Sequence, residues 1–316
     1  MKLSVWMTTY NHEKYIKQCL ESILMQETNF DFDIIIGEDC STDGTRKILE
    51  EYEKKFPGKI KLFLPEKNLG MIEMDVSTLQ LCTGSYLALL NGDDYWTSPD
   101  KLQIQVDFMD ANPDSSMCYH KAKVINEIDG SSWDTEFTGE NNFLPVEKLF
   151  KGFNPIMTSS VVCRNIMKLP DWYSEVPYGD MPLYLLLAQS GNIGYMDKVM
   201  SVYRISINGN WQGDKLENNL IKDVSYYNLI NEKFDFRYDK FIKKILAQRI
   251  FDLIVLNIKM NDLIKSRELF KTLSSSDTIS FIDNEDVVKI KSILFEKAEP
   301  ECYPELINRQ FQWHVN

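Results

Sequence analysis

Short apolar runs alternate with amphipathic stretches through the N-terminal two thirds of the chain. Four apolar runs have the length of a strand: Leu3–Met7, Asp33–Gly37, Ile60–Leu64 and Tyr86–Leu90. Between them apolar side chains recur at helical spacing, as at Ile16, Leu20 and Ile23. Continuous apolar runs are typical of parallel strands buried on both faces, and helices connect such strands. The alternation predicts an α/β fold with a Rossmann-like, mixed but mainly parallel sheet flanked by helices.

Polar loops follow the first two predicted strands. The first loop begins at Thr8, and Asn11 is the expected N-cap of the helix that follows. In the second loop, Asp39 ends a strand and is placed to accept hydrogen bonds from a base or a ribose. Alternatively Asp39 and Asp43 cap the next helix, an interpretation that we favour for Asp43. No GxGxxG motif follows the first strand, so a dinucleotide bound through a glycine-rich loop is not expected.

The run Tyr86–Leu90 ends on Asn91 and Gly92, and the adjacent carboxylates Asp93 and Asp94 follow. Ligands of open α/β sheets bind beyond the carboxyl ends of such strands. Two adjacent carboxylates repel each other unless a cation lies between them, and their oxygens suit Mg²⁺ or Mn²⁺. Asn-Gly followed by Asp is also typical of a hairpin turn, so this segment alone leaves both interpretations open.

Less regular patterns extend the predicted sheet beyond Trp96. Ser98 and Pro99 suit the N-cap and the first position of a helix. The other expected elements are strands at Met117–His120, Val124–Ile128, Thr158–Cys163 and Val199–Arg204, a helix at Leu183–Gln189, and a polar connection at 129–142 that is either a mobile lid or a surface loop.

From about Asp214 the pattern is helical to the end of the sequence. We therefore predict a first domain at 1–213 and a helical C-terminal region at 214–316. One side of its long central stretch is apolar, with basic residues interspersed: Ile242, Ile245, Leu246, Ile250 and Leu253, with Lys243, Lys244, Arg249 and Lys259. A helical appendage packed on the first domain, or a homodimer contact, is the favoured interpretation, and docking on a membrane surface is the alternative.

Composition narrows the classes of function. The formal net charge of -12 disfavours binding to nucleic acid. The six cysteines form no CxxC pair and the three histidines lack ligand spacing, so we expect buried thiols in a reducing compartment and no zinc site. The sequence begins with a strand and has no apolar run that would span a bilayer. A cytoplasmic location is therefore expected, with peripheral contact to the inner face of the membrane as an alternative.

Four motifs together resemble family 2 of the glycosyltransferases, which have the GT-A fold. They are Thr8-Thr9-Tyr10-Asn11, Glu38 to Thr45, Asn68-Leu69-Gly70, and Gly84-Ser85-Tyr86 leading into Asn91-Gly92-Asp93-Asp94. A later block, Gly179 to Tyr184 with Tyr203-Arg204 after it, is similar to bacterial members. The resemblance covers residues 1 to about 211. It implies inverting transfer of a sugar from a nucleotide-sugar, most often a UDP-sugar, to a hydroxyl of a glycan or lipid-linked acceptor in surface polysaccharide synthesis.

The resemblance also implies roles for individual residues. Those that would hold the nucleotide-sugar are Thr9, Tyr10, Asn11, Asp39, Asn68, Asp93 and Arg204. Asp94 would hold the Mn²⁺ or Mg²⁺ cofactor from a solvent-facing loop, and Asp180 would be the general base. The sequence pattern alone favours a helix N-cap at Asp180, because an apolar helix follows it. Glu175 is the next candidate for the base.

Several positions depart from the family pattern. Asn91 stands where many members have Asp, which removes one carboxylate from the acidic cluster. Asp75 and Val76 stand where Arg and Asn are frequent, and Ser206 stands where many members have His. Diphosphate binding would then depend on Arg204 and the metal. The aromatic candidates for stacking on sugar faces are Trp96, Trp172, Tyr178 and Trp211, although core positions are more typical of such residues.

Two other functions compete with glycosyl transfer. A sugar-phosphate nucleotidylyltransferase would need a glycine-rich, basic loop after the first strand, and Thr8 to His12 contains no Gly, Arg or Lys. A transferase-like domain that binds a nucleotide-sugar without turnover is motivated by Asn91, Asp75 and Ser206. Hydrolysis of the donor in the presence of Mn²⁺ separates this binding protein from an enzyme.

Overall fold

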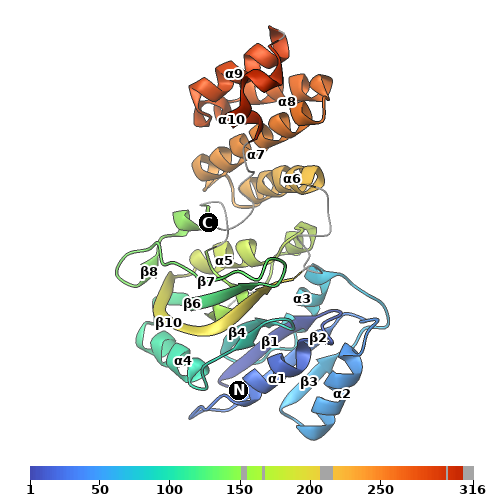
Figure 1. The fold of residues 1–316 in the computed structure, drawn as a ribbon. Coiled ribbons are helices and arrows are strands. Elements are labelled where there is room, and N and C mark those ends of the chain that lie inside the picture. The colour runs from blue at the N-terminus through green and yellow to red at the C-terminus, as the bar shows by residue number, and fades with distance from the viewer. Residues whose placement is uncertain (151–154, 166–167, 207–215, 297, 309–316) are drawn as a thin grey trace. The chain divides into compact units, whose positions relative to one another are not determined.

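A computed structural model describes residues 1–150, 155–165, 168–206, 216–296 and 298–308 (Figure 1). The chain divides into two compact units. The first comprises Met1–Leu149 and Asn154–Ile207, and the second comprises Phe150–Phe153 and Asn208–Asn316. This division sets the boundary near residue 207, where the sequence pattern placed it at 213.

One mixed sheet forms the centre of the first unit, in the order β3-β2-β1-β4-β9-β6-β10-β5. The strands are β1 (Leu3–Thr9), β2 (Phe32–Glu38), β3 (Ile60–Phe63), β4 (Tyr86–Asn91), β5 (Tyr95–Trp96), β6 (Ser115–Asn126), β7 (Ser132–Asp134), β8 (Phe143–Leu144), β9 (Val162–Arg164) and β10 (Asn192–Ile205). Strands β1 to β4 are parallel, as are β6 and β10, whereas β9 is antiparallel to both of its neighbours. The sheet confirms the predicted α/β fold with a mainly parallel sheet.

Helices cover both faces of this sheet, which explains why its strands are continuously apolar. Those of the first unit are α1 (Ile16–Leu24), α2 (Thr45–Lys55), α3 (Met71–Leu79), α4 (Lys101–Ala111) and α5 (Asp180–Ala188). Helices α1, α2 and α4 share one core with alternate strand residues such as Val5 and Met7. Helix α3 packs on β1 and β2, so closely that a Cβ at Gly37 would lie 2.1 Å from Thr78 Oγ1. Glycine is therefore needed at position 37.

Several predicted strand boundaries are wrong. Strand β1 continues through Thr9, because its backbone pairs with β2 as far as Glu38. The two strands predicted at Met117–His120 and Val124–Ile128 are the single strand β6, which pairs with β10 along its length. The polar positions of β6 are extended because they pair with a neighbouring strand, and the local sequence pattern gives no information about such pairing.

Two further segments differ from the prediction. The segment Thr158–Cys163 divides into a 3-10 turn, η2 (Thr158–Ser160), and the start of β9. The connection 129–142 contains β7, which is antiparallel to β6, so part of it is a hairpin strand.

Helix starts also differ from the prediction. Asn11 has φ +55° and is not the N-cap of α1, which begins at Ile16. Helix α4 begins at Lys101, after a turn in which the Lys101 amide donates to Ser98 O at 3.3 Å. Helix α5 begins at Asp180 and includes Pro182, because amides of a first helical turn need no helical partner.

The second unit is helical, as the prediction of a helical C-terminal region expected. Its elements are α6 (Leu216–Lys233), α7 (Asp239–Lys259), α8 (Leu263–Ser275), α9 (Asn284–Phe295) and α10 (Pro304–Ile307). Four of the five predicted apolar positions on α7 are buried: Ile242, Ile245, Leu246 and Leu253. The side chain of Arg249 is also buried and pairs with Asp223 on α6 at 3.0 Å. Within the described ranges, no helix combines the length and the apolarity needed to cross a bilayer.

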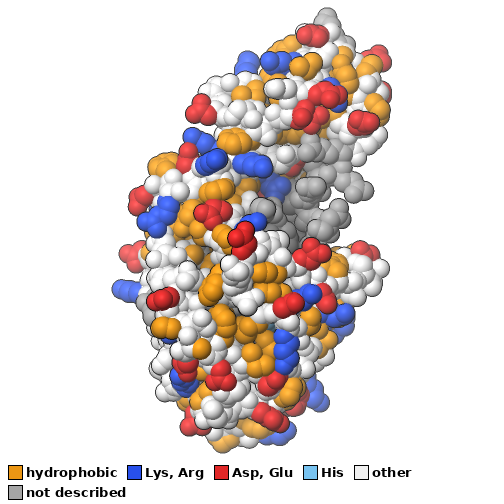
Figure 2. Space-filling view, turned by 90° about the vertical axis from the view of Figure 1, so that its left-hand side faces the viewer, with side chains coloured by type: hydrophobic (Ala, Val, Ile, Leu, Met, Phe, Trp, Pro, Cys, Tyr) orange, Lys and Arg blue, Asp and Glu red, His pale blue; other side chains and the backbone are white. Residues whose placement is uncertain are grey.

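Surface and thiol chemistry refine the composition argument. Acidic, basic and apolar side chains are interspersed on the face seen in Figure 2. All six cysteines are free thiols, and four are buried as expected: Cys19, Cys82, Cys118 and Cys163. Cys40 is partly exposed and Cys302 is exposed, so the expectation of buried thiols is wrong for these two.

A buried amine lies at the start of α4. Lys101 is 0% exposed, and its Nζ has no hydrogen-bond partner among the described residues. The nitrogen lies 4.2 Å from the centroid of the Trp96 ring, a cation–π contact. Burial lowers the pKa of Lys101 to about 7. Between that value and its unfolded pKa of about 10.4, the folded protein binds fewer protons than the unfolded chain, so this group makes stability rise with pH.

We predict that Lys101→Met raises the free energy of unfolding by about 1 kcal/mol or more near pH 6, because each unit of pKa shift corresponds to about 1.4 kcal/mol. The gain should shrink as pH rises towards about 9.5, where the buried amine is already neutral. Urea unfolding of wild type and variant at both pH values measures the effect.

The exposed Lys47 on α2 provides the matched control, and Lys47→Met should leave both stabilities nearly unchanged. A Lys101→Met variant that is destabilised equally at both pH values would contradict the assignment of an uncompensated buried amine.

Candidate active site

The carboxyl ends of β1, β2 and β4 bring three polar segments to one edge of the sheet. Thr9 on β1 pairs with Glu38 on β2, and Thr8 pairs with Asn91 on β4. The Asp39 amide donates to Thr9 O at 3.0 Å, and the Gly92 amide donates to Thr8 O at 3.2 Å. The segments that begin at Thr8, Asp39 and Gly92 are therefore fixed to each other through their backbones.

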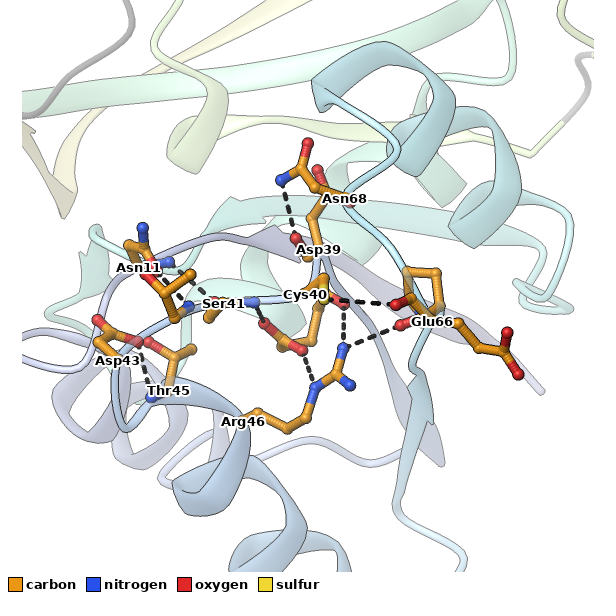
Figure 3. A network of polar contacts seen from close by, with 12 residues as sticks. Asn11, Asp39, Cys40, Ser41, Asp43, Thr45, Arg46, Glu66 and Asn68 are labelled. Atoms are coloured by element: carbon orange, nitrogen blue, oxygen red, sulfur yellow. Dashed lines mark hydrogen bonds and ion pairs between the residues drawn. The ribbon is translucent and has the colours of Figure 1, made fainter.

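Side chains tie the first two loops together (Figure 3). Asn11 Oδ1 accepts from the Thr42 amide at 2.8 Å, and the Asn11 amide donates to Ser41 Oγ at 2.9 Å. Asp43 accepts from the Thr45 amide at 2.9 Å, so it binds the start of α2 as expected, although Gly44 is the N-cap residue. Asn11 thus connects the loops after β1 and β2 instead of capping α1.

Asp39 fixes the segment that leads into α3. Its two carboxylate oxygens accept from the amides of Leu69 at 2.6 Å and Gly70 at 2.9 Å. Asn68 Nδ2 donates to Asp39 O at 2.9 Å, as Figure 3 shows. The alternative that Asp39 caps α2 is wrong, because its partners lie before α3. Gly70 has φ +85°, a conformation that glycine adopts readily. The structure therefore brings Thr9, Asp39 and Asn68 together.

The turn after β4 does not form a hairpin. The Asp94 amide donates to Asn91 O at 3.1 Å, which closes a turn. The following strand, β5, pairs with β10 through Trp96 and Ser201 and not with β4. Trp96 is 1% exposed and its Nε1 donates to Ser159 O at 2.9 Å, so its proposed stacking on a sugar is wrong. Trp211 lies outside the described residues, and Trp172 and Tyr178 are partly exposed.

Asp94 is buried at this turn, 1% exposed, so the expectation of a solvent-facing carboxylate is wrong. Its Oδ1 accepts from the Arg204 amide on β10 at 2.8 Å. Its Oδ2 has no hydrogen-bond partner among the described residues. Burial, and then the charge of Asp93, raise the pKa of Asp94 well above its usual range. A buried carboxylate oxygen without a donor is the arrangement that a cation would satisfy.

Arg204, on β10, contacts the turn from Asn91 to Asp94, which we call the acidic turn. Its guanidinium lies 4.9 Å from the Tyr15 ring centroid and 4.5 Å from that of Tyr95. It donates to Asp93 O and to Gln18 Oε1, the latter at 2.6 Å, and Glu127 lies 3.6 Å away. These contacts direct the guanidinium to residues of its own chain. The role of Arg204 as a diphosphate ligand stays a prediction.

His12 is a site residue that the sequence analysis missed. Its Nε2 lies 3.8 Å from Asp93 Oδ2, and its Nδ1 lies 3.1 Å from Thr9 Oγ1. A Cβ at Gly92 would lie 2.9 Å from this Nδ1, so the imidazole packs directly on the acidic turn. His12 could have been identified from its position directly after Asn11, in the loop that follows β1. We considered it only as a zinc ligand.

Asp180 is the first residue of α5, and its Oδ1 accepts from the Met181 amide at 2.9 Å. The N-cap position belongs to Gly179, so Asp180 is not itself the N-cap. The charges of Asp94, Asp93 and Asp180, together with burial, raise the pKa of Tyr203. Asp180 therefore lies in the same neighbourhood as the acidic turn. Tyr10, the residue after Thr9, is 43% exposed.

The residues at the acidic turn fit a divalent cation whose coordination a bound ligand would complete. In the described part of the chain, no group of three or more His, Cys, Asp or Glu side chains could hold a metal alone. Mg²⁺ typically binds one or two carboxylates together with substrate phosphates. Asp94, with its unpartnered oxygen, supplies such a carboxylate.

Comparison with known sequences gives one family. The profile described as Glycosyl transferase family 2 matches residues 4–168. An uncharacterized protein of Mycobacterium tuberculosis is 36% identical to the chain over 215 residues. The match covers 66% of this chain and 60% of that relative, so the chain spans 60% of the relative's length.

Comparison with solved structures gives the fold. S. aureus TarS 1-349, solved in complex with UDP-GlcNAc, matches with a TM-score of 0.62 at 19% identity and covers 98% of this chain and 91% of its own. The mannosyltransferase PcManGT from Pyrobaculum calidifontis, solved with GDP-Man and Mn²⁺, matches with a TM-score of 0.55 at 12% identity and covers 97% and 86%. These similarities confirm the GT-A fold.

The contact between Gly92 and the loop after β1 gives a testable prediction. A Cβ at position 92 would lie 2.3 Å from Thr9 Oγ1 and 2.7 Å from Thr9 Cβ, and Thr9 is buried. Gly92→Ala should therefore lower the free energy of unfolding by about 1–3 kcal/mol, as overpacking of a dense site does. Chemical unfolding measures the difference.

Gly44→Ala is the matched control, since the three atoms nearest to a Cβ there all belong to the side chain of the exposed Glu13. That side chain can move, so the control should lose less than about 1 kcal/mol. Equal losses in the two variants would show that the acidic turn does not pack on Thr9 and His12 as described.

Proposed function

The chain belongs to glycosyltransferase family 2, and from this we propose that it transfers a sugar from a nucleotide-diphosphate sugar to an acceptor hydroxyl. One observation carries the proposal. The buried Asp94, with its unpartnered oxygen, lies at the carboxyl edge of the sheet, beside the loops after β1 and β2. Ligands of open α/β sheets bind at this edge.

The donor's nucleoside and sugar would occupy the loops that Asp39 holds together. Asp39 has further lone pairs beyond those used by Leu69 and Gly70, so it can also accept from a base or a ribose. Thr9, Tyr10, Asn11 and Asn68 would complete this binding surface, and Asp93 would place the ribose or the sugar. A UDP-sugar is the proposed donor, supported by the UDP-GlcNAc bound to TarS, which has the same fold.

The diphosphate would lie at the acidic turn, where Asp94 and the phosphate oxygens would hold Mn²⁺ or Mg²⁺ between them. The Mn²⁺ in PcManGT supports this assignment. A divalent cation bound there acts as a Lewis acid that stabilises the charge of the leaving diphosphate by several kcal/mol. Arg204 and His12 would hold Asp93 and its backbone in place beside it.

Asp180 would act as the general base. Its carboxylate would take the proton of the acceptor hydroxyl while that oxygen attacks the anomeric carbon and the bond to the nucleoside diphosphate breaks. Attack from the face opposite the leaving group inverts the anomeric configuration. A positioned carboxylate in this role typically contributes about 10²–10⁴-fold to the rate.

The acceptor and the setting belong to the same proposal. A glycan or a lipid-linked sugar in surface polysaccharide synthesis is the proposed acceptor, in the cytoplasm, with contact to the membrane face or a second copy of the chain as further proposals. A binding protein without turnover is the second candidate, because the Arg204 guanidinium is engaged within the chain. Release of UDP from UDP-sugars in the presence of Mn²⁺ would exclude that candidate.

Binding of UDP should require a divalent metal, because the site carboxylates otherwise repel the diphosphate. Asp94→Asn should weaken UDP binding in the presence of Mn²⁺ by at least about 10-fold, to the level of wild type in EDTA. Isothermal calorimetry measures both affinities. The control is Asp134→Asn on β7, an exposed aspartate paired with Lys123, which should bind UDP normally. Equal affinity of wild type with Mn²⁺ and with EDTA would remove the metal from the proposal.

Asp180→Asn should leave UDP affinity within about 2-fold, because Asn keeps the oxygen that accepts from the Met181 amide. Turnover should fall at least about 10²-fold, since an amide cannot take the proton. Isothermal calorimetry measures UDP affinity, UDP release from a panel of UDP-sugars measures turnover, and melting temperatures check that the fold is intact.

Glu175→Gln is the companion variant, because the exposed Glu175 is the alternative base. Near-normal turnover by Asp180→Asn together with a large loss in Glu175→Gln would transfer the role of base to Glu175.

A further inference from the structure

We propose that Asp75 takes up a proton when a nucleotide diphosphate binds, so that this one carboxyl couples donor binding to pH. The inference deepens the proposed function and rests on it. Asp75 would then determine how the affinity for the donor changes with pH.

Asp75 lies at the junction of three elements. It belongs to α3, and its Oδ1 accepts from Thr8 Oγ1, at the end of β1, at 2.9 Å. A Cβ at Gly179, just before α5, would lie 3.5 Å from Asp75 Oδ2. The carboxyl therefore lies between the loop proposed to hold the nucleoside and the start of the helix that carries Asp180.

The groups that face Asp75 are acidic. Asp39 after β2 and Asp180 on α5 both act on its charge, and Tyr173 on η3 (Asp171–Glu175) lies close enough for Asp75 to act on it. Among the residues that the structure describes, no Lys or Arg forms an ion pair with Asp39 or Asp75. Asp75 is half-buried. Its partial removal from water, with the charges of Asp180 and Asp39, raises its pKa to about 7, although the hydroxyl of Thr8 acts in the opposite direction. Near neutral pH, the protonated and the ionised forms of Asp75 are therefore both populated.

A bound diphosphate adds negative charge to this cluster, and a like charge disfavours the ionised form of a carboxyl. Asp39 already accepts from two backbone amides, and Asp180 is proposed to act as the base. Asp75 has the smallest barrier to neutralisation, since it is already half protonated near neutral pH. Protonation removes its repulsion and leaves an O–H donor in the site. If Asp75 were only a tether between α3 and β1, Asn could replace it and the pH dependence of UDP binding would not change.

Calorimetry of UDP binding in Mn²⁺ tests the inference, at about pH 6 and about pH 8, in two buffers of different ionisation enthalpy. For wild type, the affinity should weaken towards about 10-fold per pH unit above about pH 7, with uptake approaching one proton per UDP at the higher pH. Asp75→Asn keeps an oxygen for Thr8 but cannot titrate, so its affinity should depend less on pH and its proton uptake should be smaller by the same amount. The difference between the two proteins removes the protons exchanged at Asp94 and elsewhere.

Thr8→Val is the matched control, because it removes the hydrogen bond to Asp75 and leaves the carboxyl free to titrate. It should keep a pH dependence and a proton uptake as large as those of wild type, shifted to higher pH because the Thr8 hydroxyl lowers the pKa of Asp75. Equal pH dependence and proton uptake in wild type and Asp75→Asn, with UDP bound by both, would overturn this inference and leave the proposed function standing. So would an Asp75→Asn variant that is weaker by a constant factor at both pH values. Failure of wild type to bind UDP or any UDP-sugar at either pH would overturn the proposed function and this inference together.

Discussion

Negative charge gathered at the carboxyl edge of β1, β2 and β4 is the constraint on which the rest of the site depends. Parallel strands bring their carboxyl ends to one edge, and here that edge carries Glu38, Asp39, Asp93 and Asp94. Buried carboxylates are unstable unless they are compensated. The surrounding loops and helices can be understood as the means by which each of these charges is compensated.

The compensation differs from one carboxylate to the next. Glu38 is 0% exposed and accepts from Arg46 on α2 and from the Ser41 amide at 2.6 Å. Asp39 is compensated by backbone amides alone, which fixes the segment before α3. Asp94 Oδ1 accepts from the Arg204 amide, and its Oδ2 has no hydrogen-bond partner among the described residues. Glu38 and Asp39, whose carboxylates already accept from groups of the chain, hold the loops together, and Asp94, with an oxygen that lacks a partner among the described residues, is the candidate for binding a cation.

The sequence predicted the fold better than the site, for physical reasons that individual residues illustrate. Apolar runs such as Leu3–Met7 reflect burial of a strand on both faces, which a local pattern reports. The polar end of that strand, Thr8 and Thr9, is extended only because β2 and β4 pair with it. The burial of Asp94 and the approach of His12 to Asp93 come from β10 and from the loop after β1, which are distant in sequence from the motif Asn91 to Asp94. Contacts of this kind leave no periodicity to detect.

The position of Arg204 bears on the proposal that a cation binds at this edge. Its guanidinium lies between the rings of Tyr15 and Tyr95, with Gln18, Asp93 O and Glu127 around it. Its backbone amide, rather than its charge, reaches Asp94. Positions 75 and 206 carry Asp and Ser, neither of which supplies a positive charge. A diphosphate at the acidic turn would therefore meet little positive charge supplied by these residues, which is the physical basis for proposing a metal ion there.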